Sequence, residues 1–334
     1  MELALPLACF RLVLRAQSSI RFNHYSGSAW RGLFGHALRQ TACVTGQRDC
    51  SGCMLYRSCV YAAVFETPPP PDTQYMRRYN AAPHPFILTP DPALRLLNPG
   101  EETELNLVLI DRAVAQLPYL VHAFTLAGKR GVGAEKGHFE LIDIRQETCP
   151  GSGEWVSIFD NGSLQPLPPA APKAPPLPDH IELELTSPLR VKYNNRIMST
   201  RYFVFAGVIS NLLRRVSMLS YFHASQPFDT DFRALVIQAQ EIVPASNQLK
   251  WFDWHRYSSR QQTKIKMSGL VGTITFSGDD LEPFWPLLWT GQWLHAGKGT
   301  SMGLGAYRIG DASRRVAGST RDIGKRMGKA VTSL

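Results

Sequence analysis

Four cysteines fall within one short segment of the chain. Cys43, Cys50, Cys53 and Cys59 form a C-x6-C-x2-C-x5-C pattern and account for four of the six cysteines in the sequence. Four thiolates can hold one Zn²⁺ tetrahedrally, and in a reducing compartment such a cluster favours a metal site over disulfides. We therefore expect a structural zinc, because four protein ligands leave no open position for catalysis. The alternative is a set of reduced thiols packed in a small loop.

Glycine and lysine recur in two similar segments, AGKRGVGAEKGHFELI (127–142) and AGKGTSMGLGAYRI (296–309). Glycine lets backbone N–H groups approach a phosphate closely, and neighbouring lysines add positive charge. These segments therefore suit an RNA backbone, although their glycines could serve tight turns alone. Neither contains G-x4-G-K-[ST], which argues against a nucleotide hydrolase. The candidate RNA-binding residues here are Lys129, Lys136, Lys298, Gly303 and Gly305.

Aromatic and basic residues alternate in a third segment, residues 251–260. In RNA-binding proteins aromatic rings stack on bases and arginines pair with phosphates. The alternative is a strand with buried aromatic side chains and a solvated basic face. The RNA-binding candidates of this segment are Trp254, Arg256, Tyr257 and Arg260.

The composition indicates a basic globular protein. Its 334 residues exceed the usual length of one domain, so two domains are expected. The formal charge of +9 favours an anionic partner. No apolar run reaches about 18 residues, the length that spans a bilayer, and the first residues lack a signal-peptide pattern. We therefore expect a cytoplasmic protein that does not associate with membranes.

The first half of the chain predicts strands and helices in alternation. Residues 26–40 repeat apolar side chains at helical spacing, and Asp111 is placed to cap a second helix reaching about Leu126. The apolar stripe of the first helix comprises Trp30, Leu33, Phe34, Ala37 and Leu38. Half-buried strands are expected at residues 8–16, 103–110 and 138–144.

The second half repeats this pattern after a Pro- and Ala-rich tract within residues 150–178, which is expected to be a linker. Helices are expected over residues 202–222 and 283–294. Strands are expected at residues 181–185, 234–243, 250–257 and 269–276. Each glycine segment follows a helix and enters a strand, so two related α/β units are predicted.

Four stretches of the chain resemble the RAMP superfamily of CRISPR-associated proteins, specifically its repeat-processing endoribonucleases, the sixth of the Cas families. They are SAWRGLFGHALR (28–39), CVYAAVFE (59–66), the pair WHRYSSRQ and MSGLVGTITF (254–276), and GKGTSMGLGAYRI (297–309). The resemblance implies an α+β protein with tandem ferredoxin-like folds and a stem-loop RNA as substrate. The glycine-rich loop in each half and the small insertion with four cysteines would be features of this chain.

The resemblance also suggests the domain organisation. We expect residues 1–149 to form an N-terminal ferredoxin-like domain, with the cysteine cluster at 43–59, and residues 179–310 to form a C-terminal RNA-binding domain. Residues 150–178 would connect the two. The basic tail, residues 311–334, would touch RNA or form a disordered end.

The chemistry implied by the family is attack of a ribose 2'-OH on the adjacent phosphate, which leaves a cyclic phosphate and requires no metal. Such a reaction needs a general base, a general acid and a cation near the charged transition state. His36 is the favoured catalytic residue, because it lies off the apolar stripe near Arg31 and Arg39. His24 and Tyr25 are rival candidates just upstream. Arg39 is grouped with the catalytic candidates and Arg31 with the RNA-binding ones.

The predicted function is maturation of CRISPR RNA, in which the repeat stem-loop of the precursor is bound and cut on the 3' side of the stem to give guide RNA. One alternative is a non-catalytic RNA-binding subunit of a CRISPR ribonucleoprotein effector complex, with other Cas proteins as partners. Another is a zinc-stabilised adaptor that binds other proteins.

Overall fold

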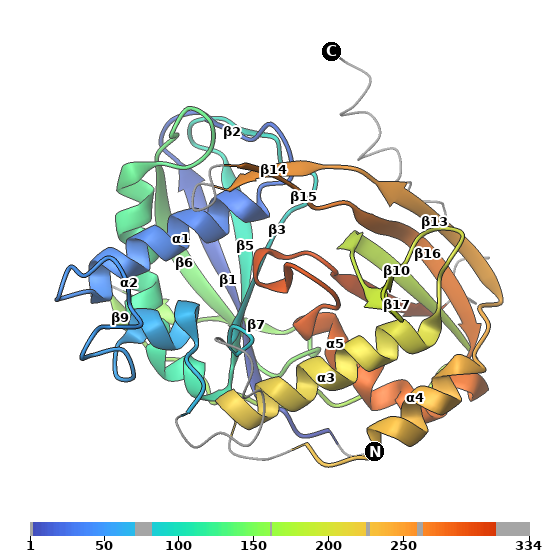
Figure 1. Ribbon diagram of the computed structural model, residues 1–334. Coiled ribbons are helices and arrows are strands. Elements are labelled where there is room, and N and C mark those ends of the chain that lie inside the picture. The colour runs from blue at the N-terminus through green and yellow to red at the C-terminus, as the bar shows by residue number, and fades with distance from the viewer. Residues whose placement is uncertain (1–2, 71–81, 161, 225–227, 259–262, 312–334) are drawn as a thin grey trace. The chain divides into compact units, whose positions relative to one another are not determined.

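The computed structural model describes residues 3–70, 82–160, 162–224, 228–258 and 263–311 (Figure 1). The chain divides into two compact units. The first, here called the N-terminal unit, comprises Leu3–Pro172 and Arg214–Asp229, and the C-terminal unit comprises Lys173–Leu213 and the chain from Thr230 onward. Within the described ranges, no helix combines the length and apolar character needed to cross a membrane.

The N-terminal unit is built on a five-stranded antiparallel sheet in the order β3-β5-β1-β6-β7. Its main elements are β1 (Leu7–Ala16), α1 (Gly27–Ala42), β3 (Phe86–Pro90), β5 (Glu102–Ile110), α2 (Leu117–Arg130), β6 (Phe139–Glu147) and β7 (Trp155–Ser157). Its shorter elements are β2 (Ile20–Arg21), η1 (Ala62–Glu66), β4 (Leu96–Leu97), η2 (Asp111–Gln116), β8 (Phe159–Asp160) and β9 (Ser163–Leu164). The two helices lie on one face of the sheet (Figure 1). The chain order β-α-β-β-α-β with the first strand in the middle of the sheet is the ferredoxin-like arrangement.

Aromatic side chains hold the two helices to this sheet. Phe34 of α1 stacks on Phe124 of α2, with ring centroids 4.9 Å apart, and meets Phe86 of β3 edge-on at 5.4 Å. Phe34 is fully buried, as is Trp30 one turn earlier. The apolar stripe predicted for the first helix is therefore confirmed, because its residues face the sheet.

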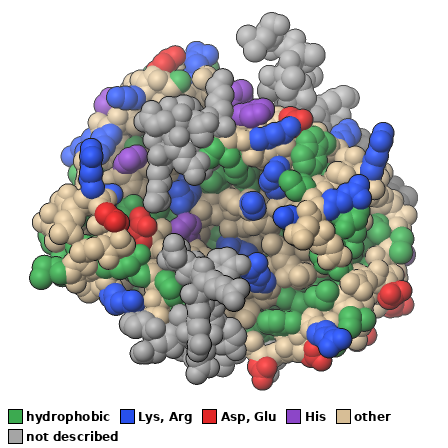
Figure 2. Space-filling view, in the orientation of Figure 1, with side chains coloured by type: hydrophobic (Ala, Val, Ile, Leu, Met, Phe, Trp, Pro, Cys, Tyr) green, Lys and Arg blue, Asp and Glu red, His purple; other side chains and the backbone are tan. Residues whose placement is uncertain are grey.

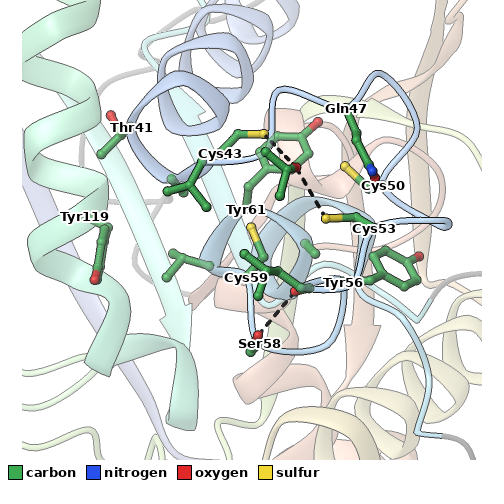
Figure 3. A pocket seen from close by; sticks show the side chains of 16 residues that line it. Thr41, Cys43, Gln47, Cys50, Cys53, Tyr56, Ser58, Cys59, Tyr61 and Tyr119 are labelled. Atoms are coloured by element: carbon green, nitrogen blue, oxygen red, sulfur yellow. Dashed lines mark hydrogen bonds between the residues drawn. The ribbon is translucent and has the colours of Figure 1, made fainter.

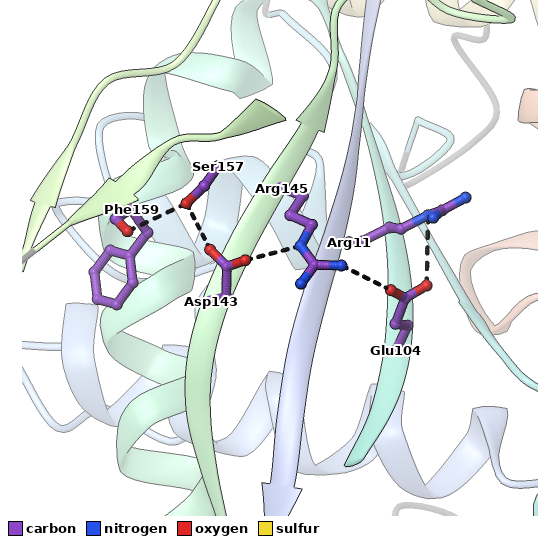
Figure 4. Close-up of polar contacts among 6 residues, drawn as sticks. All are labelled: Arg11, Glu104, Asp143, Arg145, Ser157 and Phe159. Atoms are coloured by element: carbon purple, nitrogen blue, oxygen red, sulfur yellow. Dashed lines mark hydrogen bonds and ion pairs between the residues drawn. The ribbon is translucent and has the colours of Figure 1, made fainter. Parts of the chain in front are cut away.

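Charged residues line the opposite face of the sheet (Figure 4). Glu104 of β5 lies 3.5 Å from both Arg11 of β1 and Arg145 of β6. Arg145 also pairs with Asp143 at 2.8 Å, and the Ser157 hydroxyl donates to Asp143 at 2.7 Å. This network links four strands, but its members are partly exposed, so each pair contributes only about 0.2–1 kcal/mol.

The first part of the expected linker, residues 150–178, belongs instead to the N-terminal unit. The ring of Trp155 lies 3.9 Å from the Arg11 guanidinium, which anchors β7 at the sheet edge. The side chain of Gln146 forms two hydrogen bonds of 2.9 Å with the backbone of Leu167. Proline lacks an N–H but keeps its carbonyl, so a Pro-rich segment can still lie along a sheet edge in extended form.

The C-terminal unit has a four-stranded antiparallel sheet in the order β13-β16-β10-β17. Its main elements are β10 (His180–Leu189), α3 (Phe205–His223), β13 (Ser246–Phe252), β16 (Gly269–Ser277), α5 (Trp285–Leu294) and β17 (Tyr307–Asp311). Its shorter elements are β11 (Lys192–Tyr193), β12 (Arg196–Ile197), α4 (Phe232–Gln240), η3 (Asp279–Phe284), η4 (Thr300–Met302) and a hairpin of β14 (His255–Ser258) and β15 (Thr263–Lys266). Helix α3 continues past Leu213 into the residues assigned to the N-terminal unit. The order of the main elements again gives a ferredoxin-like unit, so the predicted tandem arrangement is confirmed.

The predicted helix cap at Asp111 is wrong. Asp111 begins the 3-10 helix η2 with φ at 32°, and α2 starts only at Leu117. Pro118 lies in the first turn of α2, where a missing N–H has no effect on helical hydrogen bonding. The proline therefore places the start of α2 later than Asp111, and the helix runs on to Arg130.

The predicted strand at residues 234–243 is also wrong, because this segment contains helix α4. Two adjacent β-branched residues, Val236 and Ile237, favour a strand by propensity. The side chain of Asp231, however, accepts a hydrogen bond of 3.0 Å from the backbone N–H of Ala234. This N-cap starts the helix and outweighs the propensity.

Candidate RNA-processing site

Helix α1 carries the favoured catalytic residue on its exposed side. His36 is exposed, whereas Arg39, one turn further on, is partly buried and forms hydrogen bonds. The guanidinium of Arg39 donates to the carbonyl oxygens of Gln47 and Arg48 and lies 5.6 Å from the ring of Tyr61. Arg39 thus anchors the cysteine segment, and His36 is the more available of the two for chemistry.

The two upstream candidates differ sharply in their surroundings. His24 is exposed, but only 8% of Tyr25 is accessible to solvent. Burial raises the pKa of the Tyr25 phenol well above its ordinary value, which makes it a poor proton donor or acceptor near neutral pH. The exposure of the histidines and the raised pKa of the Tyr25 phenol therefore favour the histidines over the tyrosine.

Arg31, a predicted RNA-binding residue, contacts a histidine that the sequence analysis did not single out. Its Nη2 lies 2.9 Å from Nε2 of His84, just before β3. Arginine can only donate, so Nε2 accepts and the ring proton must be on Nδ1. Burial, together with the nearby charges of Arg31, Arg215 and His223, lowers the pKa of His84 to about 3.

Two further residues of the same unit, both on α3, complete this group. Burial lowers the pKa of Arg215 to about 10 and that of His223 to about 4. The Nε2–H of His223 donates to the carbonyl oxygen of Pro83 at 2.7 Å, which fixes the backbone next to His84. We call Arg31, His84, Arg215 and His223 the basic cluster.

The lowered pKa values of His84 and His223 predict that the protein loses stability in mild acid. Their folded pKa values lie below the ordinary 6.5, so only the unfolded chain takes up these protons as the pH falls from 6.5 towards 4. The free energy of unfolding should fall by at most about 1.4 kcal/mol per pH unit and per histidine. Urea unfolding at pH 7 and pH 5 measures this loss. The loss should be smaller in His223→Gln, and an equal loss in both proteins would contradict the assignment.

Each glycine segment connects the second helix of a ferredoxin-like unit to the fourth strand of its β-α-β-β-α-β order, α2 to β6 and α5 to β17. Lys129, Lys136 and Lys298 are exposed, as a role in RNA binding requires. Gly303 and Gly305 are buried with φ values of 84° and 70°. Their geometry supports the tight-turn alternative for the glycines, and RNA binding by the lysines remains a prediction.

The aromatic and basic segment is described only in part. Trp254 is 5% exposed, which suits packing better than stacking on a base. Arg256 and Tyr257 lie in β14, but their side chains are outside the described residues, as are Arg260 and residues 312–334. Their predicted contacts with RNA remain predictions. On the face in Figure 2, Lys and Arg side chains are more frequent than Asp and Glu, in line with the positive net charge.

The four clustered cysteines, Cys43, Cys50, Cys53 and Cys59, line one cavity of about 280 Å³ (Figure 3). None of them forms a disulfide. The hydroxyl of Thr45 lies 3.4 Å from Sγ of Cys53 and 4.0 Å from Sγ of Cys43. In the part of the chain that the structure describes, however, no three His, Cys, Asp or Glu side chains are arranged to hold a metal ion.

The electrostatics of these thiols are mixed. A hydrogen bond from the backbone of Gly46 is the main cause that lowers the pKa of Cys43, and burial raises that of Cys50. Zinc binds thiolates, so ligation would require the Cys50 proton to be displaced. The described positions of the four cysteines are not those of zinc ligands, and the structural zinc remains a prediction.

Metal analysis of protein purified without added zinc tests this prediction. We expect about one equivalent of zinc, with all four thiols protected from a thiol reagent, because structural sites hold metal tightly. Less than about half an equivalent together with four freely reacting thiols would favour the alternative of reduced, packed cysteines. Cys149, which is exposed, serves as an internal reference for a reactive thiol.

Comparison with known proteins agrees with this architecture. The AF_1859_N N-terminal domain model matches residues 5–171, and the model of the CRISPR-associated endoribonuclease Cas6 matches residues 183–307. A Cas6 product complex shares the fold with a TM-score of 0.53 at 15% identity, over 91% of this chain and 99% of that chain. Thermus thermophilus Cas6 gives a TM-score of 0.50 at 15% identity, over 92% and 100% of the two chains. No curated protein sequence matches this one significantly.

A longer relative extends the comparison. In a partial Cas6-RT-Cas1–Cas2 complex, the similar chain gives a TM-score of 0.55 at 13% identity, over 92% of this chain but only 46% of that chain. These similar structures agree with two ferredoxin-like units in tandem. Residues 183–307 match the family model of the CRISPR-associated endoribonuclease Cas6, so this part of the chain is a Cas6 endoribonuclease domain.

Proposed function

We propose that this protein binds the repeat stem-loop of a CRISPR precursor transcript and cuts it on the 3' side of the stem. The ribose 2'-OH attacks the adjacent phosphorus and the P–O5' bond breaks. The products are a 2',3'-cyclic phosphate and a free 5'-OH, and no catalytic metal takes part. The observation that carries the proposal is the exposed imidazole of His36 on α1 of a chain that contains a Cas6 endoribonuclease domain.

His36 is the proposed proton-transfer residue, acting on the 2'-OH or on the 5' oxygen that leaves. Its exposure lets a phosphate approach, and histidine is the side chain most often used for general acid–base catalysis. His24 is exposed as well and is the alternative. Tyr25 is the weakest candidate because it is buried.

RNA binding and partners are proposed on the same basis. The net charge of +9 suits a polyanion, and the exposed Lys129, Lys136 and Lys298 suit its backbone. Similar structures are described as a Cas6 product complex and as a Cas6-RT-Cas1–Cas2 complex. We therefore expect this chain to bind guide RNA and to associate with other Cas proteins.

The purified protein, incubated with repeat RNA in excess EDTA, should cleave the RNA at one position. The upstream product should carry a cyclic phosphate, seen as a mass about 18 Da below that of the linear phosphate, since ring closure loses one water molecule. Cleavage that stops in EDTA and returns with Mg²⁺ would contradict the metal-independent mechanism. Tight binding of RNA that stays intact would instead identify a non-catalytic subunit of an effector complex.

A further inference from the structure

The basic cluster of the N-terminal unit has a feature that its packing does not explain. Nδ1 of His84 is buried and makes no hydrogen bond to any residue that the structure describes. Because Nε2 accepts from Arg31, Nδ1 must carry the proton. A buried N–H donor without an acceptor is unfavourable, so its presence here points to an acceptor that binds there.

We propose that Arg31, His84 and Arg215 form a binding site for one backbone phosphate of the RNA. The inference rests on the proposed function and names a contact within it. The phosphate oxygen would accept from Nδ1–H of His84, and the two guanidinium groups would neutralise its charge. His223 is a positioning residue, since its hydrogen bond to Pro83 holds the backbone next to His84.

The charges around His84 select an anion. The permanent charges that lower the pKa of His84 are the guanidinium groups of Arg31 and Arg215, and no acidic group among the described residues raises it. Burial lowers the pKa of Arg215, so its charge is held in a poorly solvated place. Charges in such surroundings act strongly on a ligand because water screens them little.

The cluster remains open to a ligand of this kind. Arg31, His84, Arg215 and His223 each keep part of their surface exposed to solvent, although the Nδ1 atom itself is buried. The imidazole is held by aromatic neighbours, with its ring centroid 5.6 Å from that of Phe86 and 6.1 Å from that of Phe65. A neutral, rigidly held donor beside two guanidinium groups suits a phosphate. We favour RNA over an acidic protein because the chain is basic and contains a Cas6 endoribonuclease domain.

This site is separate from the proposed reaction centre. His36 follows Arg31 by five residues, which places the two about 140° apart around α1. One phosphate cannot reach both sides of the helix, so the cluster would bind a phosphate that flanks the scissile one. Loss of the cluster should therefore weaken binding and leave the cleavage rate of bound RNA largely unchanged.

The test measures the affinity of a repeat hairpin that carries 2'-deoxy nucleotides at the 3' base of its stem and cannot be cleaved there. His84→Phe keeps a ring but loses the donor and should weaken binding about tenfold or more. His84→Asn keeps an N–H near the position of Nδ1 and should stay within about threefold of wild type. Arg215→Gln should reduce the slope of log affinity against log salt by about 0.7–0.9.

The matched control is Arg15→Gln, which removes an exposed arginine paired with Glu102 at 2.8 Å in the same unit. Its salt slope should equal that of the wild type. Circular dichroism and thermal unfolding establish that each variant folds. If folded His84→Phe and Arg215→Gln bind as the wild type does, the cluster is structural and the proposal is wrong.

A second measurement separates this inference from the proposed function. The ¹⁵N resonance of His84 Nδ1 is followed while inorganic phosphate is added to the wild-type chain. A saturable shift, absent from Arg215→Gln, supports the anion site, and no shift overturns it. If the wild type leaves the hairpin unbound, the proposed function fails. A saturable phosphate shift in that case would assign the cluster to an acidic partner and overturn its assignment to RNA.

Discussion

Replacing His36 with alanine should slow cleavage of repeat RNA by about 10² to 10⁴, the usual contribution of one proton-transfer group. Affinity for uncleaved RNA should change little, because a general acid or base acts in the transition state and contributes little to ground-state binding. The rate should be measured in single-turnover experiments with enzyme in excess, so that product release does not mask the chemical step.

His24→Ala and Tyr25→Phe are the matched variants for this experiment. Tyr25→Phe removes a hydroxyl whose pKa burial raises, so its cleavage rate should be nearly that of the wild type. If His36→Ala cleaves at the wild-type rate while His24→Ala is slow, the proton-transfer group lies before α1. If all three cleave normally, an arginine-based mechanism becomes the better explanation.

The fold could be predicted in the places where one periodic pattern dominates. The apolar residues from Trp30 to Leu38 fall on one side of the chain only if it is helical, and this segment lies in α1. The second half failed at α4, where adjacent β-branched residues masked the cap made by Asp231. Strand β3 was missed because its five residues are too short to show a period.

The reaction centre and the basic cluster differ in how far the sequence could indicate them. His36 stands out from the apolar stripe of its own helix, a local signal that needs no tertiary structure. Arg31 and His84 are 53 residues apart, and His223 is 140 residues from Pro83. No spacing rule joins residues at such separations, so only the folded N-terminal unit places them together.

The glycine-rich segments show how one pattern can have two causes. The sequence predicts that their glycines and lysines bind phosphate together, yet the two residue types are in opposite environments. Lys298 is exposed, whereas Gly305 is buried between backbone segments. The backbone N–H of Gly305 donates to the carbonyl of Pro188 at 3.1 Å, and its carbonyl accepts from Ala296 at 3.0 Å.

Gly305→Ala is therefore expected to destabilise the protein by about 3 kcal/mol or more, whatever its effect on RNA. A Cβ at this position would lie 1.7 Å from the carbonyl oxygen of Ala296, and a φ of 70° is strained for alanine. Gly310→Ala is the matched control, because no atom lies within 4 Å of its added Cβ. Its free energy of unfolding should change by less than about 1 kcal/mol. Urea unfolding of both variants measures the difference.

The complementary change is Lys298→Gln, which should leave the free energy of unfolding within about 0.5 kcal/mol of wild type, as is usual for a surface substitution. If the exposed lysine binds an RNA phosphate, this variant should reduce the salt slope of hairpin binding by about 0.7–0.9. Gly305 would then be needed because two backbone segments approach each other closely there, and Lys298 would be needed because it binds the RNA. A stable Gly305→Ala protein that has lost RNA binding would reverse this assignment, because the glycine would then be needed for the approach of the phosphate itself.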